Sequence, residues 1–181
     1  MAQNTPHRVS LNTMKIHLNP SLLMAAALVA CSALMADDAK NENVSVSFHE
    51  SEKFTDVRSS FGGTTDEYYL TTLSKHLKKA AAKHLAPGQK LEVTFTDIDL
   101  AGDFVPTNPK AQDVRVIRDI WIPRQKLTFR LLDEQGHVVK EGERRLTDLN
   151  FMNNIGIIGR NEPLFHDKAL LTDWVAKELR S

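Results

Sequence analysis

Residues 64–95, TTDEYYLTTLSKHLKKAAAKHLAPGQKLEVTF, decide the fold because they encode a helix, a stop signal and a strand in succession. Thr64 and Glu67 have the spacing of a capping box at a helix start, and Pro87-Gly88 is a typical helix end. Between them, apolar residues recur at helical spacing: Leu70, Leu73, Leu77, Ala80, Ala81 and Leu85. This spacing predicts a helix with one face on a core, and the alternation over 91–95 predicts a strand after it.

Similar patterns extend the prediction to both sides of this unit. Alternating apolar residues predict strands over 44–48, 114–122 and 127–131, and the turn at 133–136 predicts a hairpin return over 137–141. A last helix is predicted over 164–179, with a buried stripe made of Leu170, Leu171, Trp174 and Val175. The order strand, helix, several strands, helix favours an α+β fold. We expect a two-layer single domain over 44–181, with a mainly antiparallel sheet and two main helices packed on one face.

The beginning of the chain has the character of an export signal. Lys15 and His17 precede an apolar run over 22–30, which is too short to span a bilayer as a helix. We therefore predict a signal peptide over 14–36, preceded by an over-called start or disordered extension over 1–13. The polar residues 37–43 are predicted to be a disordered lead-in to the domain.

Cys31, the only cysteine, gives the signal two alternative endings. The sequence Leu28-Val29-Ala30-Cys31 fits a lipobox, in which Cys31 is lipidated and becomes the mature N-terminus. Cleavage after Ala36 would instead discard this cysteine with the signal peptide. Both alternatives predict an exported protein, either periplasmic or tethered to the outer membrane.

Composition narrows the possible partners and chemistries. Residues 1–36 contain two basic and no acidic side chains, so the remaining 145 residues carry 21 basic and 23 acidic ones, a net charge of −2. A chain with so small a net charge has no strong positive potential to attract phosphate groups, so a nucleic-acid partner has no support. A mature chain cut after Ala36 has no cysteine for disulfides or thiol catalysis. We expect no transmembrane segment in the mature chain, and an envelope protein or a small ligand as partner.

Charged residues interrupt the apolar alternation of two predicted strands. Continuing the alternation past Phe95 places Asp97 on the apolar face, which requires either a bulge after Phe95 or a buried carboxylate. Arg118 similarly falls among the apolar positions of 114–122. Because a lone buried charge is costly, we predict that Asp97 or Asp99 pairs with Arg115 or Arg118.

Three interpretations of this polar cluster remain open. They are a structural ion-pair network, a calcium or similar cation site made by Asp97, Asp99 and Asp103, and a ligand pocket or acid–base pair made by Asp97, Asp99 and Arg118. The acidic loop lacks the final glutamate of an EF-hand, and the chain contains no HExxH, GxSxG or Walker motif. We therefore expect a non-enzymatic binding or interaction module without a cofactor, and calcium is the alternative to that absence. The alternative is a metal-dependent or acid–base enzyme that uses the Asp97-Asp99-Asp103 loop with Arg115 or Arg118.

Several sequence blocks resemble those of the bacterial "domain of unknown function 3016" family. They are Phe54-Thr55-Asp56-Val57, the block TFTDIDLAG over 94–102, the block VRVIRD over 114–119, Pro123 and residues 168–174. The resemblance covers about 44–175 and implies a short exported bacterial protein. It assigns motif positions to Asp56, Asp97, Asp99, Gly102, Arg115 and Arg118. It implies no activity and no catalytic residue.

Overall fold

The computed structural model describes residues 41–58, 65–105, 114–153 and 162–180. The predicted signal peptide, with Cys31, lies outside these residues, as does most of the predicted lead-in. The elements in chain order are β1 Val44–Phe48, η1 Ser51–Lys53, α2 Glu67–Ala82, β2 Lys90–Asp99, β3 Asp103–Phe104, β4 Arg115–Val116, β5 Arg124–Leu132, β6 Val138–Thr147, η2 Phe151–Asn153 and α3 Phe165–Glu178.

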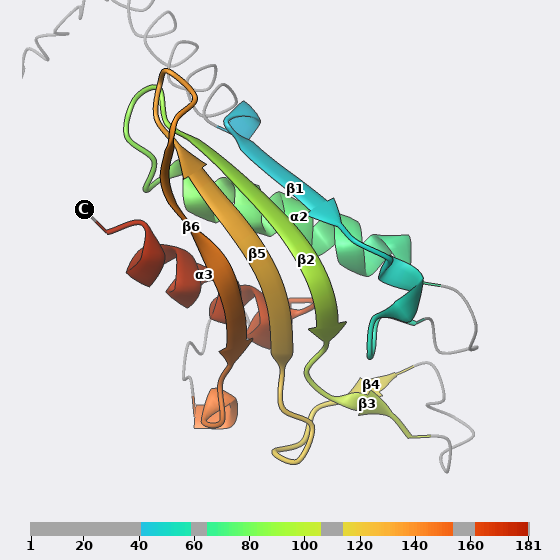
Figure 1. Ribbon diagram of the computed structural model, residues 1–181. Coiled ribbons are helices and arrows are strands. Elements are labelled where there is room, and N and C mark those ends of the chain that lie inside the picture. The colour runs from blue at the N-terminus through green and yellow to red at the C-terminus, as the bar shows by residue number, and fades with distance from the viewer. Residues whose placement is uncertain (1–40, 59–64, 106–113, 154–161, 181) are drawn as a thin grey trace, which may run out of the picture. The chain divides into compact units, whose positions relative to one another are not determined.

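Within the described residues, β1, β2, β5 and β6 form the main sheet in that order, and β3 and β4 form a small second sheet. The β1–β2 pair is parallel, whereas β2–β5 and β5–β6 are antiparallel. Parallel neighbours need a long crossover, and α2 lies in the connection between β1 and β2. Both α2 and α3 cover the same face of the sheet (Figure 1). The predicted two-layer α+β fold is therefore confirmed.

The start of α2 differs in detail from its prediction. Asp66 is the N-cap, and its carboxylate accepts a hydrogen bond from the backbone N–H of Tyr68 at 2.9 Å. The predicted cap Thr64 lies outside the described residues. The apolar positions predicted for the core are buried, and they pack with the inward side chains of β2 and β5 and with α3. Burial of this helix face, more than intrinsic helix propensity, stabilises α2.

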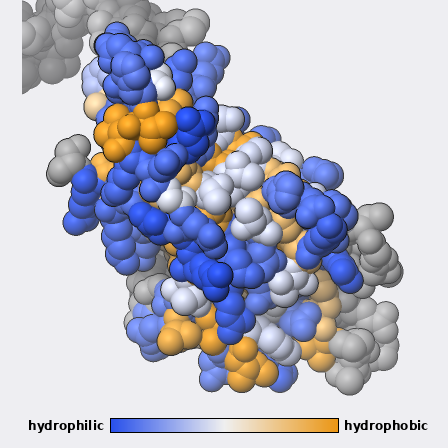
Figure 2. Space-filling model, viewed as in Figure 1, coloured by the Kyte–Doolittle hydropathy of each residue, from blue (hydrophilic) through white to orange (hydrophobic). Residues whose placement is uncertain are grey.

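The opposite face of the sheet is polar. Glu92 and Arg130 are direct cross-strand neighbours, and their side chains form an ion pair of 3.2 Å. The carboxylate of Glu141 on β6 lies 3.7 Å from Nε of the same arginine. Hydrophilic residues cover much of this face in Figure 2. Such a face needs no third layer, because its side chains remain hydrated.

The predicted strand over 114–122 is wrong. Only Arg115–Val116 is extended, as β4, where it pairs with β3, and a turn follows at Asp119-Ile120. Val114 and Ile120 are 56% and 66% exposed. The alternation of apolar residues here arises from a loop with exposed apolar side chains and not from a strand with a buried face.

No helix among the described residues is long and apolar enough to cross a bilayer.

Candidate functional site

A β-bulge decides where the acidic side chains of β2 lie. Phe95 pairs with Leu127, and Asp97 pairs with the next residue, Lys126, so the strand register shifts at this point. Beyond the bulge, Ile98 is fully buried and the carboxylates of β2 lie on the polar face of the sheet. Of the two alternatives that the sequence left open, the bulge is therefore the correct one.

Asp97 is held by three donors. Its Oδ1 accepts hydrogen bonds of 2.9 Å from both the backbone N–H and the hydroxyl of Thr55, and its Oδ2 lies 2.9 Å from Nζ of Lys126. Partial burial raises the pKa of Asp97, but these hydrogen bonds outweigh it and hold the pKa below its ordinary value. Asp97 therefore ties the segment after η1 to the main sheet.

Asp99 lies on the same face, beside a different cation. Nη1 of Arg124 is 3.0 Å from its Oδ2. The pKa of Asp99 is raised, chiefly by burial, and the neighbouring carboxylates of Asp56 and Asp97 add to the effect against the opposing influence of Arg124. Asp56 is close because its segment pairs with β2 at Asp99 as an isolated parallel bridge.

Asp56 and Arg115 form the most buried ion pair of this region. The guanidinium binds the carboxylate through two nitrogens, at 2.5 and 3.0 Å, and also donates to the carbonyl of Gly102 at 2.7 Å. The side chain of Arg115 is only 10% exposed and lies over the ring of Phe104, 4.8 Å from its centroid. Burial opposes the charged guanidinium, but Asp56 raises the pKa of Arg115 above its ordinary value.

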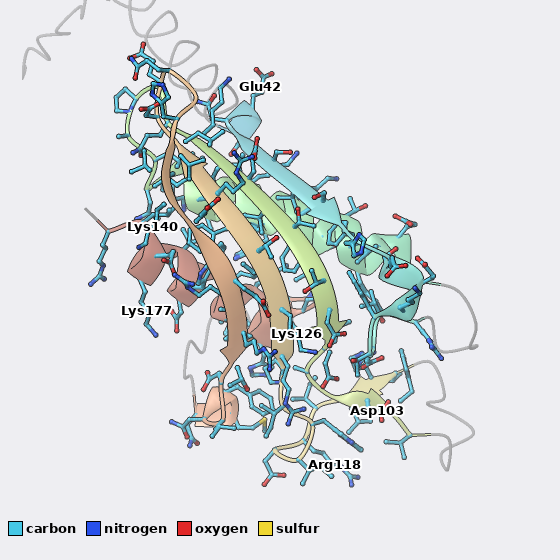
Figure 3. All side chains as sticks on the ribbon, viewed as in Figure 1. Glu42, Asp103, Arg118, Lys126, Lys140 and Lys177 are labelled. Atoms are coloured by element: carbon cyan, nitrogen blue, oxygen red, sulfur yellow. The ribbon has the colours of Figure 1, made fainter. Side chains whose placement is uncertain are left out.

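The predicted pairing of Asp97 or Asp99 with Arg115 or Arg118 is therefore wrong. Arg115 is bound to Asp56, whereas Arg118 is exposed on the loop after β4, 5.4 Å from the ring of Trp121 (Figure 3). The sequence argument failed because it assumed a strand over 114–122. The partners that it missed, Lys126 and Arg124, occupy the cross-strand positions opposite Asp97 and Asp99.

The three acidic side chains of the hypothetical cation site do not converge. Asp97 and Asp99 are engaged by basic side chains, whereas exposed Asp103 accepts a hydrogen bond from the N–H of its neighbour Phe104 at 2.7 Å. Within the part of the chain that the structure describes, no group of three His, Cys, Asp or Glu side chains could hold a metal ion. The donor set thus gives the calcium interpretation no support.

A hollow of about 290 Å³ opens beside these ion pairs. Its polar walls are Thr55, Asp56, Asp99, Asp103 and Arg124, and its apolar walls come from Ile120, Trp121 and Ile122. Gly102 also lines it, with a φ of +79° and no room for a side chain, because a Cβ there would lie 2.5 Å from the carbonyl oxygen of Val116. The hollow therefore lies between the end of β2 and the loop after β4.

Asp167, in the first turn of α3, is a buried carboxylate that the sequence analysis missed. Its Oδ1 accepts a hydrogen bond of 3.2 Å from the N–H of Ala101, directly before Gly102. Burial raises its pKa to about 7, against the lowering effects of that hydrogen bond and of the charge of Arg115. The signal was available, since residue 167 shares the helix face of Leu170, Leu171 and Trp174.

The sequence blocks that carried the family resemblance meet at this end of the main sheet. Thr55 and Asp56 come from the first block, Asp97 to Gly102 from the second and Arg115 from the third. A family model described as "Protein of unknown function (DUF3016)" matches residues 42–177. No curated protein and no solved structure matches the chain.

Proposed function

We propose that this chain, which belongs to the DUF3016 family of proteins of unknown function, is an exported envelope protein that acts as a small, non-enzymatic binding module. The observation that carries this proposal is the pairing of the carboxylates at the end of the main sheet. Asp56, Asp97 and Asp99 each have a basic partner within 3.0 Å.

This pairing supports binding over catalysis. A general acid or base needs a titrating group within reach of a substrate proton, and it exchanges that proton freely. Asp97 is committed to Thr55 and Lys126, and Arg115 is enclosed by Asp56, Gly102 and Phe104. The enzyme alternative, with the Asp97-Asp99-Asp103 loop and Arg115 or Arg118, would have to break these contacts before it could act.

The hollow beside the ion pairs is the proposed ligand site. It combines the carboxylate of Asp103, the hydroxyl of Thr55 and the guanidinium of Arg124 with the flat apolar surface of Trp121. Ligand sites commonly join a few placed polar groups to apolar walls, and about 290 Å³ suits a small molecule. We therefore expect a small polar ligand with a flat or apolar part that packs against Trp121.

Native mass spectrometry of the protein purified from its own cells tests this site. We expect a bound small molecule on the wild-type protein, and its loss from a Trp121→Ala variant. Tyr68→Ala is the matched control, because Tyr68 is an exposed aromatic residue on α2 and does not line the hollow. The same added mass on Trp121→Ala as on the wild type, or no added mass on the wild type, would contradict the proposal.

A partner protein is a second candidate occupant of the same end of the molecule. Ile117, Ile120, Leu149 and Met152 are exposed there, and exposed apolar groups of this kind often mark interaction sites. Hydrophobic surface is visible along the lower part of the molecule in Figure 2. Chemical crosslinking of intact cells, with Leu149→Ser as the variant, separates this candidate from a small ligand, because Leu149 is exposed and does not line the hollow. Loss of a crosslinked partner in this variant supports the partner protein, and an unchanged crosslinking pattern contradicts it.

Export belongs to the same proposal and has its own test. The apolar run over 22–30 after Lys15 supports a signal peptide, and Cys31 supports a lipid anchor as one of two possible ends. Mass spectrometry of the mature N-terminus, from membrane and soluble fractions, distinguishes the two. An N-terminal Asp37 excludes the anchor, a lipidated Cys31 establishes it, and an uncut chain refutes export.

A further inference from the structure

Two consecutive residues, Ala101 and Gly102, connect the buried carboxylate of Asp167 with the ligand hollow. The N–H of Ala101 donates to Oδ1 of Asp167 at 3.2 Å. The next N–H, that of Gly102, donates to the carbonyl oxygen of Trp121 at 3.1 Å. The carbonyl oxygen of Gly102 accepts a hydrogen bond from Nη1 of Arg115 at 2.7 Å. Because Gly102 and Trp121 line the hollow, one short stretch of backbone joins the buried carboxylate to its walls.

The guanidinium of Arg115 is under the influence of two carboxylates. Asp56, which lines the hollow, binds Nη1 and Nη2, whereas the buried Nε has no hydrogen-bond partner within the described residues. The positive charge of Arg115 also lowers the pKa of Asp167, and the negative charge of Asp56 acts in the opposite direction. An ionised Asp167 therefore competes with Asp56 for a guanidinium that still has an unused donor.

Other polar and charged groups surround Asp167 on β5 and on α3 itself. Gln125 of β5 is an uncharged amide, and its Nε2 donates to the backbone carbonyl of Asp167 at 3.4 Å. On α3, Asp167 is flanked by His166 and by Lys168, whose ammonium lies 3.5 Å from the carboxylate of Glu162. Since a histidine ordinarily titrates near pH 6.5, an experiment must separate His166 from Asp167.

We propose that the protonation of Asp167 regulates the ligand hollow, which takes one form in mildly acid and another in mildly alkaline conditions. In the acid form, the neutral carboxyl leaves the guanidinium of Arg115 to Asp56. In the alkaline form, the carboxylate strengthens its hydrogen bond to the backbone and draws the guanidinium inward, so Asp56 presents more negative charge to the hollow. The same change reaches Trp121 through the hydrogen bonds of Gly102.

The burial of Asp167 sets where this regulation operates and how it acts. Burial raises the pKa of Asp167 to about 7, so both forms are populated near neutral pH. The residue is 1% exposed, so it acts on a ligand only through Ala101 and Arg115. This inference rests on the proposed function, because it assigns a regulation to the proposed ligand site.

Nuclear magnetic resonance of the purified protein, from about pH 5.5 to 8.5, tests the proposal without a ligand. We expect the carboxyl carbon of Asp167, the indole N–H of Trp121 and the amide of Gly102 to shift together, with one midpoint near pH 7. The chain has two tryptophans, so Trp121→Phe identifies the indole signal of Trp121 by its loss. In Asp167→Asn the signals of Trp121 and Gly102 should stay constant, whereas in His166→Gln they should keep the wild-type midpoint.

Trp174 is the internal control, because it lies on α3 with Asp167 and does not line the hollow. An Asp167 carboxyl that titrates while Trp121 and Gly102 stay unmoved would overturn the coupling, even if Asp167→Asn does not fold. A Trp174 signal that follows the same curve would also overturn it, by placing the change in the whole helix.

The two variants add their own contrary outcomes. Reporter signals that still titrate in Asp167→Asn, or that stop titrating in His166→Gln, would assign the effect to another group and overturn the proposal. The mass-spectrometric search for a bound molecule is a separate measurement. A hollow that responds to pH but holds no ligand contradicts the proposed function alone, and a ligand in a hollow without this response contradicts the regulation alone.

Discussion

Arg115 is the most buried basic side chain among the ion pairs of the described residues. It is 10% exposed, and Asp56 is the acidic side chain that binds it. We expect Asp56→Ala to lower the free energy of unfolding by about 3 kcal/mol, because it leaves a buried guanidinium without its counter-charge. Urea titration measures the change.

Asp97→Ala is the matched comparison for that experiment. Its basic partner Lys126 is 45% exposed and can turn to water, so we expect a smaller loss of about 2 kcal/mol, most of it from the two hydrogen bonds of Thr55. Equal losses in the two variants would show that burial of the basic partner does not decide the cost.

Asp167 makes the stability depend on pH in an unusual direction. Its pKa of about 7 in the folded protein lies above the ordinary value of 3.8, so the folded state keeps its proton longer than the unfolded state. The stabilising contribution is complete below pH 4 and is lost as the pH rises to 7, by about 4 kcal/mol. Asp167→Asn should therefore match the wild type near pH 4 and be more stable at pH 8. A constant difference in urea midpoint across this range would contradict the assignment.

At the scale of elements, Gly102 sets how closely β4 approaches the end of β2. Its φ of +79° disfavours any side chain, and an added Cβ would also meet the backbone of Val116 at 2.5 Å. Gly136 has a similar φ of +86°, but a Cβ there meets nothing within 4 Å. We expect Gly102→Ala to cost at least about 2 kcal/mol more than Gly136→Ala in thermal or urea unfolding, since only the first adds a clash. Similar losses of stability in the two variants would show that the positive φ alone, and not the clash with Val116, causes the effect.

The spacing of apolar residues predicted the helices and strands that bury one face. It failed at residues 114–122, where a loop has the same spacing as a strand. The helix face of α2 and the alternation of β1, β2 and β5 followed directly from the sequence, because a buried face requires that spacing. Residues 114–122 show the same alternation without burial, which a single sequence cannot reveal. The parallel pairing of β1 with β2 was also out of reach, because it depends on how α2 crosses the sheet.

The carboxylates at the end of β2 were predictable from the sequence, but their basic partners and the buried Asp167 were not. The acidic and basic positions at the end of β2 and in the third block were identified from the broken alternation. Their partners depend on the bulge after Phe95, which brings Asp97 opposite Lys126 and Asp99 opposite Arg124. Strand register of this kind is a tertiary property, so sequence spacing alone assigned the wrong cations.

At the scale of the whole molecule, the charged side chains occupy two environments. Some lie on the hydrated face of the sheet, and others lie on the face that the helices cover. The ion pairs of the open face are largely exposed, so each contributes little to stability. Asp167 and Glu178 differ from them because both lie on α3 and are enclosed where this helix meets the sheet. These two carboxylates have the largest pKa shifts among the described residues, so they dominate the response of the fold to pH.

Their effects oppose each other, which predicts an optimum of stability at mildly acid pH. The hydrogen bonds from Arg144, reinforced by Lys140, lower the pKa of Glu178 to about 2 from 4.5. Its contribution is therefore present above pH 4.5 and is lost as the pH falls through 2, by about 1–2 kcal/mol after screening at these partly exposed bases. Asp167 loses its contribution above pH 4, so the thermal midpoint should be highest near pH 4–5. Glu178→Gln should flatten the acid side of this curve, to which Asp97 also contributes, and Asp167→Asn should remove the neutral side. A midpoint that rises steadily to pH 8 in the wild type would refute the burial of Asp167.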